Sequence, residues 1–234
     1  SLQALYRQFL ANRVNDGKNA FAMRHLALGD SFPGITVDPA LGWFRGTYLY
    51  ARHVWGAQSL RPAAWVAPLR QEALTAYIAL NTALAHPAPR LAGLAMPPYA
   101  DELLALAHKR DPRHRYEWTF HREVTPARIL SLRAADGDLA TEGTATGSRV
   151  SVQALVRFDT EQSVEIYDAQ GRALHTPASP AVDPARGKTQ PARVPAQRTR
   201  ITEYLVIDKA MYLPDASWRF RARLVPEPGR TVAV

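Results

Sequence analysis

Hydrophobic and polar residues alternate along several segments in the second half of the chain. These segments are residues 116–121, 129–134, 150–158, 164–168, 204–209 and 218–224. In the first, Tyr116, Trp118 and Phe120 fall on one face of the predicted strand. In the second, Ile129 and Ser131 fall on one face of the predicted strand and Leu130 falls on the other. A period of two, with many aromatic and β-branched residues, predicts strands that each bury one face.

Two short stretches between the predicted strands carry residues that form tight turns. They are Asp-Gly-Asp at 136–138 and Asp-Ala-Gln-Gly at 168–171. Glycine tolerates positive φ, and Asp caps a turn with its side chain. Short connections of this kind favour antiparallel neighbours, so we expect a curved antiparallel sheet with one buried face.

Apolar residues recur at helical spacing in the first half of the chain. The predicted helices are residues 2–14, 18–28, 43–58, 62–84 and 99–109, with a break at 15–17. The strongest is 62–84, where Pro62 suits the first turn of a helix. Helices that precede an antiparallel sheet predict an α+β fold in which the helices cover one face of the sheet.

The predicted helix 43–58 is rich in aromatic residues, and these are interleaved with Arg45, Arg52 and His53. Aromatic and Arg side chains together suit a membrane interface or the stacking of RNA bases. The alternative is an ordinary helix that packs on the domain, and we favour it because aromatic residues at helical spacing are mostly core residues.

The pattern divides the chain into an N-terminal helical and loop extension (1–61), an α+β domain (62–226) and a tail (227–234). Within the domain, residues 176–200 are dominated by Pro, Ala and Arg and show no apolar period. A segment of this composition is expected to be disordered in isolation, so we interpret it as an insertion.

Composition narrows the function classes. The chain has 234 residues and no cysteine, which excludes disulfides, zinc–thiolate sites and cysteine nucleophiles. The formal net charge is +8 and comes mostly from Arg, which suits a polyanionic partner. A protein that merely has a high isoelectric point is the alternative. No apolar run is long enough to span a membrane. Because the first residue is Ser1, the sequence either starts late or has lost a targeting peptide.

Catalytic and metal-binding patterns are weak. His121-Arg122-Glu123 has the form H-x-E, but no further His or Cys pair lies at ligand spacing. Gly143 and Gly147 lack the strand–turn–helix context of a nucleotide site. Tyr167 and Asp168 could form a site in a cavity, but a packed Tyr and a turn-forming Asp explain them better. We therefore expect no catalytic residue, no metal and no cofactor.

Basic residues form clusters around 109–115, 186–200 and 219–223. The candidate contacts with RNA or an anionic surface are Lys109, Arg110, Arg113, Arg115, Arg186, Lys188, Arg193, Arg198, Arg200, Arg219, Arg221 and Arg223. In the last cluster, Arg219, Arg221 and Arg223 are predicted to form one stripe opposite an apolar face. A solvated outer face is the alternative. Contacts with phosphates and with RNA shape, rather than base reading, are the expected mode.

Several stretches carry a family resemblance. They are Tyr116 to Phe120, Gln162 to Arg172 (QSVEIYDAQGR), Glu203 to Lys209 (EYLVIDK) and Ser217 to Phe220 (SWRF). They resemble the C-terminal domain of the Tim-forty-four-like family, and within it the branch found in the mitochondrial large ribosomal subunit. The resemblance covers about residues 73–226. The sequence departs from the family pattern at 176–200. Residues 1–70 cannot be matched to the family, so no family role is assigned to them.

The resemblance implies a cystatin-like, or nuclear-transport-factor-two-like, cone in which helices pack on a curved sheet. It also implies a non-catalytic protein near the polypeptide exit tunnel, in the mitochondrial matrix at the inner membrane. The expected partners are large-subunit rRNA, neighbouring ribosomal proteins, anionic inner-membrane lipid and the membrane insertase. The alternative is a peripheral import-motor or insertase-adaptor protein without RNA contact. A small-molecule-binding or enzymatic domain of the same cone-shaped fold is a third, weaker alternative.

Overall fold

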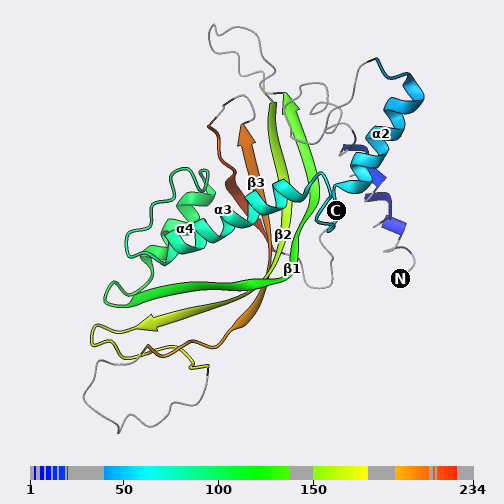
Figure 1. Cartoon of the computed structure of the whole chain (residues 1–234). Coiled ribbons are helices and arrows are strands. Elements are labelled where there is room, and N and C mark those ends of the chain that lie inside the picture. Colours follow the sequence, from blue (N-terminus) through cyan, green and yellow to red (C-terminus); the bar gives the residue numbers. More distant parts are fainter. Residues whose placement is uncertain are drawn as a thin grey trace, which may run out of the picture.

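The computed structural model shows an α+β architecture in which helices pack against a four-stranded open antiparallel sheet. It describes residues 40–136, 150–178, 193–210, 213 and 215–225, together with residues 3, 6, 7, 9–11, 13, 14, 16–18 and 20. The strand order β1-β2-β3-β4 follows the chain, so each strand pairs with its sequence neighbours. Figure 1 shows the sheet bending strongly, with its lower half turned to the side on which α4 lies.

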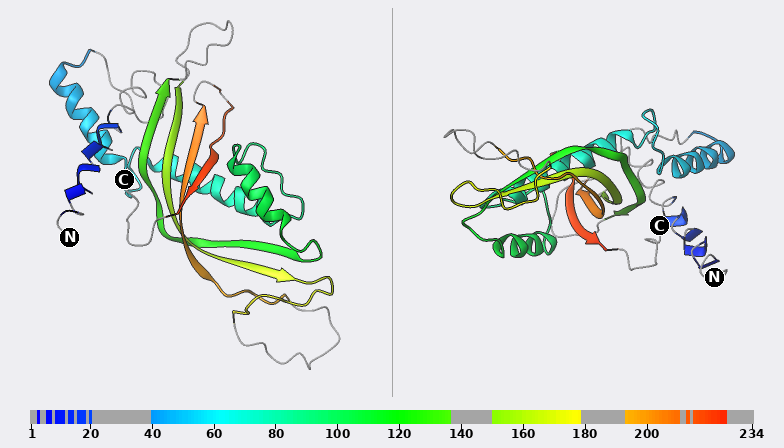
Figure 2. Two further views of the ribbon diagram at one scale, coloured as in Figure 1. Left: turned by 180° about the vertical axis from the view of Figure 1, so that it is seen from behind. Right: turned by 90° about the horizontal axis from the view of Figure 1, so that it is seen from below.

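Three helices precede the sheet in the part of the chain from residue 40 onward. They are α2 (Trp43–Gly56), α3 (Ala67–Ala85) and α4 (Tyr99–His108). Helix α3 packs mainly on β1, and α4 packs on β4. Helix α2 stands on the other side of the sheet from α4 (Figures 1 and 2).

Most helix predictions are confirmed in place, but two boundaries are wrong. Helix α3 begins at Ala67 with Pro68 in its first turn, and residues 57–66 form turns in which Ala57 and Val66 are buried. The break predicted at 15–17 is also wrong, because Asp16 and Gly17 are helical and Asp16 pairs with Arg13 at 3.5 Å. Residues 21–28 of the predicted second helix lie outside the described residues.

The strands are longer than the alternating segments suggested. They are β1 (Arg115–Asp136), β2 (Val150–Tyr167), β3 (Thr199–Ala210) and β4 (Arg219–Leu224). The turn at 168–171 is confirmed: Gly171 has φ 77° and donates its N–H to the carbonyl of Asp168 at 3.0 Å. The predicted turn at 136–138 lies mostly outside the described residues, as does the tail 227–234.

The bend of the sheet coincides with irregular pairing in β1. The register against β2 shifts four times between Phe120 and Ser131. Each β-bulge adds a residue to one strand, which bends it and increases its twist. Because of the last shift, the predicted alternation at 129–134, which placed Ile129 and Leu132 on opposite faces, is wrong. Ile129 opposes Val156, and Leu132 opposes Ala154. Ile129 and Leu132 therefore share the inner face, which looks toward α3, whereas Ser131 lies on the outer face.

The core lies between α3 and the inner face of the sheet. Tyr77 of α3 stacks on Phe158 of β2 with ring centroids 4.5 Å apart, and Phe158 contacts Phe220 of β4. On β2 the buried residues of the inner face are Val152, Ala154, Val156 and Phe158, which matches the predicted face. Residues 94–96 cover the free edge of β4, where the Phe220 N–H donates to the Leu94 carbonyl at 2.8 Å.

The segment predicted as an insertion belongs in part to the domain. Residues 177 and 196 form an antiparallel bridge, Gln197 donates its N–H to the Thr176 carbonyl at 2.9 Å, and Ala196 is buried. Strand β3 already begins at Thr199. Hydrogen bonds between its two ends therefore order both of them, although the segment has no apolar period. Residues 179–192 lie outside the described residues.

Candidate functional site

The predicted basic residues do not form one surface. Arg186 and Lys188 lie outside the described residues. The others divide between the outer face of the sheet, the loop that follows α4, and the inner face. Most of the described arginines among them are held by carboxylates from other elements, which the linear sequence did not reveal.

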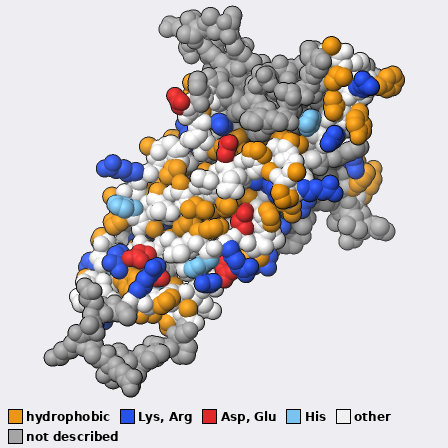
Figure 3. Space-filling view, in the orientation of Figure 1, with side chains coloured by type: hydrophobic (Ala, Val, Ile, Leu, Met, Phe, Trp, Pro, Cys, Tyr) orange, Lys and Arg blue, Asp and Glu red, His pale blue; other side chains and the backbone are white. Residues whose placement is uncertain are grey.

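The largest group lies on the outer face, over the half of the sheet beyond the bend. Strand β2 places a row of carboxylates there: Asp159, Glu161 and Glu165. We call the arginines around them the outer arginine surface, which consists of Arg115, Arg122, Arg193, Arg198 and Arg200. Figure 3 shows Lys and Arg side chains with acidic ones between them at the lower end of the molecule. Arg122 is a member that the sequence reading missed, because only the strand register places it beside Glu161.

The ion pairs of this surface are asymmetric. The side chain of Asp159 is 1% exposed, whereas that of its partner Arg200 is 60% exposed. Glu165 is 4% exposed and its partner Arg193 is 62% exposed. The carboxylates are therefore the buried members, and the guanidinium groups form the layer that faces solvent.

Asp159 is the most heavily bonded of these carboxylates. Arg200 donates to its two oxygens at 2.8 and 2.7 Å, and the Thr125 hydroxyl donates at 3.0 Å. The hydrogen bonds from Arg200 outweigh the effect of burial and hold the pKa of Asp159 below its usual range. The same contact raises the pKa of Arg200. Both groups are charged at neutral pH.

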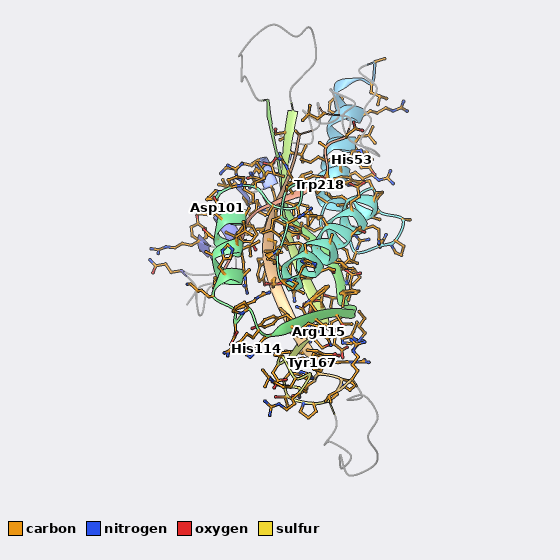
Figure 4. The ribbon with its side chains drawn as sticks, turned by 90° about the vertical axis from the view of Figure 1, so that its left-hand side faces the viewer. His53, Asp101, His114, Arg115, Tyr167 and Trp218 are labelled. Atoms are coloured by element: carbon orange, nitrogen blue, oxygen red, sulfur yellow. The ribbon has the colours of Figure 1, made fainter. Side chains whose placement is uncertain are left out.

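Glu165 anchors the strand-like segment around Arg193. It accepts hydrogen bonds from Arg193 Nε and from the Tyr167 hydroxyl, each at 2.8 Å. Burial by itself would raise the pKa of Glu165, but these two donors lower it below the usual value. Arg115 lies over the Tyr167 ring at 5.0 Å and pairs with Glu117 at 3.1 Å, and Figure 4 shows Arg115 and Tyr167 together at this end.

Strand β4 corrects the predicted arginine stripe. Between the pairs Ile207–Phe220 and Val206–Ala222 the register shifts by one residue, so Arg221 is the extra residue of a bulge. Arg221 reaches Asp208 at 3.4 Å. Arg223 opposes Leu205 on the inner face and pairs with Glu203 at 3.3 Å. The prediction of one continuous stripe is wrong because the bulge reverses the alternation within the strand.

The cluster at 109–115 is divided as well. Arg113 is held by Asp111 through two hydrogen bonds at 3.1 and 2.8 Å. These bonds lower the pKa of Asp111 far below its usual value. Arg110 donates to the Leu84 carbonyl at 2.6 Å, which anchors the end of α3, and its guanidinium lies over Tyr116. Among the residues described, Lys109 and Arg219 form no ion pair within 4 Å.

A hollow of about 670 Å³ lies on the inner face of the same half of the sheet. The end of α3 and Arg110 form one wall, the three strands β1 to β3 form the floor, and residues 175–176 and 196–197 close the far end. Its apolar surface comes from Leu84, Tyr116, Trp118, Val164, Ile166 and Ile201. Val164 is 44% exposed, so this apolar strand residue is left uncovered at the floor.

A polar network joins the hollow to the core. The Tyr77 hydroxyl donates to Glu203 at 2.6 Å and accepts from Gln162 at 3.3 Å. Trp118 donates its indole N–H to the Gln162 amide oxygen. Burial, and then the negative charge of Glu203, raise the pKa of Tyr77 well above its usual value, so the phenol remains a donor. These residues come from four different elements, and no local sequence signal could have assembled them.

Some of the other residues that the sequence analysis considered for a catalytic, metal or nucleotide site lie within the described part of the chain. Asp168 caps the turn with its side chain by accepting from the Gln170 and Arg172 N–H groups, and Tyr167 is packed, as predicted. His121 contacts the Ser163 hydroxyl at 2.9 Å. Within the described part of the chain, His, Cys, Asp and Glu form no group that could hold a metal ion. Gly143 and Gly147 lie outside it.

Fold and site together define an α+β protein with a bent antiparallel sheet, a charged outer face and a hollow inner face. No protein-family model matches the chain, and no curated protein matches it significantly. None of the described helices is both long and apolar enough to cross a membrane.

Proposed function

We propose that the chain is a non-catalytic component of the mitochondrial large ribosomal subunit. In this role it binds rRNA and neighbouring ribosomal proteins near the polypeptide exit tunnel and helps to attach the ribosome to the inner membrane. We also propose that the bent sheet and its helices form a cone of the cystatin-like, or nuclear-transport-factor-two-like, class.

The observation that carries the RNA contact is the asymmetry of the ion pairs on the outer arginine surface. Arg193, for example, places one Nε–H on the buried Glu165 while most of its side chain remains exposed. A guanidinium has five N–H donors in a fixed fork, so donors remain for a phosphate. The buried carboxylates hold the arginines in place, which reduces the side-chain entropy lost on binding.

The family resemblance is consistent with this proposal, because the sequence stretches that carry it lie next to one another in the fold. The stretches at 162–172, 203–209 and 217–220 belong largely to the neighbouring strands β2, β3 and β4. They define how the sheet is built and contain no catalytic signature. The proposal is therefore one of a binding protein and not of an enzyme.

Helix α2 supports the membrane part of the proposal. Phe44 is 82% exposed and Tyr48 is 63% exposed, and both Arg45 and Arg52 are exposed on the same helix. Exposed aromatic and basic residues on one helix suit the interface of an anionic bilayer. The same observation favours the second candidate, a peripheral import-motor or insertase-adaptor protein without RNA contact.

Gradient sedimentation of a detergent-solubilised mitochondrial extract separates the two candidates. We expect the protein to migrate with large-subunit RNA at low and at high salt, as an integral ribosomal component does. Loss from the RNA only at high salt would indicate a peripheral ribosome receptor held by phosphate contacts. Migration away from the RNA under both conditions would overturn the ribosomal proposal in favour of the adaptor.

A further inference from the structure

The hollow on the inner face has the properties of a small-molecule site, and the proposed function does not use it. Its volume of about 670 Å³ lies within the range of about 300–1,000 Å³ that is typical of ligand pockets. Tyr116 and Trp118 give the floor an aromatic surface, and the exposed Val164 leaves further apolar surface there. An aromatic or branched apolar body fits this lining.

The polar groups at the hollow indicate the charge of the ligand. Glu203 is already neutralised by Arg223 and bonded by the Tyr77 hydroxyl. Arg223 has a single long contact with that carboxylate and is 55% exposed. Arg110 uses Nη1 for the Leu84 carbonyl and has no carboxylate within ion-pair distance among the described residues. Among the described residues that line it, the hollow therefore offers two guanidinium groups with unused donors and one acid, which is already paired.

The network behind these groups keeps the site in one conformation. Gln162 is bonded by both Trp118 and Tyr77, and Tyr77 is packed against Phe158 in the core. A buried polar network in which each of these members has its partner is rigid and specific. Preorganised groups of this kind lose little entropy when a ligand binds.

We propose that the hollow binds a small carboxylate that carries an aromatic body. The body lies against Tyr116, Trp118 and Val164, and the carboxylate lies at the rim, where it accepts hydrogen bonds from Arg110 and Arg223. The site is separate from the outer arginine surface, which lies on the opposite face of the sheet. The inference therefore stands or falls independently of the proposed ribosomal role.

Calorimetric titration of the full chain with 2-naphthylacetate and with its uncharged analogue 2-naphthylacetamide tests the site. We expect the carboxylate to bind about tenfold more tightly than the amide, because hydrogen bonds to charged groups are the stronger ones. Arg110→Gln combined with Arg223→Gln is expected to remove this preference while the amide still binds, which also shows that the hollow remains folded.

A second pair of variants locates the site. Val164→Trp fills the hollow from an exposed floor position and is expected to weaken binding of both compounds about tenfold or more. Leu106→Trp makes the same change at an exposed position on α4 outside the hollow, and it is expected to leave binding unchanged. Equal affinity for both compounds, no binding at concentrations of about 10 mM, or full binding by Val164→Trp would each overturn the proposal.

Discussion

At the scale of single residues, the outer face depends on carboxylates that are buried beneath arginines. Asp159 illustrates this arrangement, because it is almost fully covered and accepts from Arg200 and Thr125. Removing the exposed arginine would leave the buried carboxylate uncompensated, and this costs more than the pair itself contributes. Such residues hold the surface in place even where they do not touch its ligand.

Asp159→Asn is expected to lower the free energy of unfolding by about 2 kcal/mol at pH 7. The pKa of Asp159 is lowered in the folded state, so its contribution is present above the unfolded pKa of about 4 and is lost as the pH falls through the folded value. The difference between variant and wild type should therefore shrink below about pH 4. Urea unfolding of the variant and the wild type, at pH 7 and below about pH 4, measures this difference in the free energy of unfolding. Asp111→Asn, which removes an exposed pair with Arg113, serves as the control and should cost much less.

Tyr77→Phe tests the network behind the hollow. The variant keeps the aromatic stack on Phe158 but leaves Glu203 and Gln162 each without one hydrogen bond. We expect a loss of about 1–2 kcal/mol in the free energy of unfolding, measured by urea denaturation. Tyr48→Phe removes a hydroxyl from an exposed ring on α2 and is the matched control. Equal stability of the two variants would show that the network does not stabilise the fold.

At the scale of elements, bulges determine which residues share a face. The extra residue at Arg221 sends Arg223 to the hollow, and the shifts in β1 bring Ile129 and Leu132 onto the same face. The bend that these shifts accompany separates the packed half of the sheet from the half that carries the hollow and the outer arginine surface. One irregular region of pairing therefore positions both candidate sites.

Helix α2 is the element for which we expect membrane contact. The double variant Phe44→Ala, Tyr48→Ala should reduce binding to vesicles of anionic and zwitterionic phospholipid about tenfold, because it removes the exposed aromatic surface of α2. Co-sedimentation with the vesicles measures this effect. Leu106→Ala on α4 is the control, since it removes exposed apolar surface elsewhere. Undiminished binding of the double variant would exclude α2 as the contact.

At the scale of the whole molecule, the excess of positive charge is spread over a scaffold that pairs part of it with carboxylates. The chain has a formal charge of +8, yet every member of the outer arginine surface has a carboxylate within 4 Å. Under the proposed function, affinity for RNA comes from the remaining donors of these arginines and from the long-range field. Both effects weaken as salt is added.

Arg198→Gln should weaken RNA binding at low salt and reduce the slope of log affinity against log salt by about one unit, because one phosphate contact is lost. Among the arginines of the outer arginine surface, Arg198 is the one whose replacement should disturb the fold least, because its contact with Glu161 is 3.9 Å long. Arg90→Gln removes the same charge at an exposed loop position and should leave the slope unchanged. Filter binding with large-subunit rRNA fragments over a series of salt concentrations measures both. Equal slopes would contradict a phosphate contact at Arg198.

Local patterns in the amino-acid sequence were enough to predict most of the elements and the α+β fold class. Alternation along 150–158, the turn at 168–171 and the helical stripe that ends at Leu84 are local properties, and each predicted the presence of its element, although the helix begins at Ala67 and not at Pro62. Local patterns also placed Tyr116, Trp118 and Phe120 on one face. Backbone geometry sets these periods within a few residues, so no knowledge of distant contacts is required.

Contacts between side chains that are far apart in the sequence could not be predicted from local patterns. Arg200 donates hydrogen bonds to Asp159, and Tyr77 reaches Glu203 across more than a hundred residues of chain. Both contacts depend on strand register and helix packing. A single bulge reverses every face that follows it, and nothing in the run from Arg219 to Leu224 marks its position. The hollow likewise exists because the sheet bends, and the bend results from the pairing of β1 with β2 and not from either strand alone.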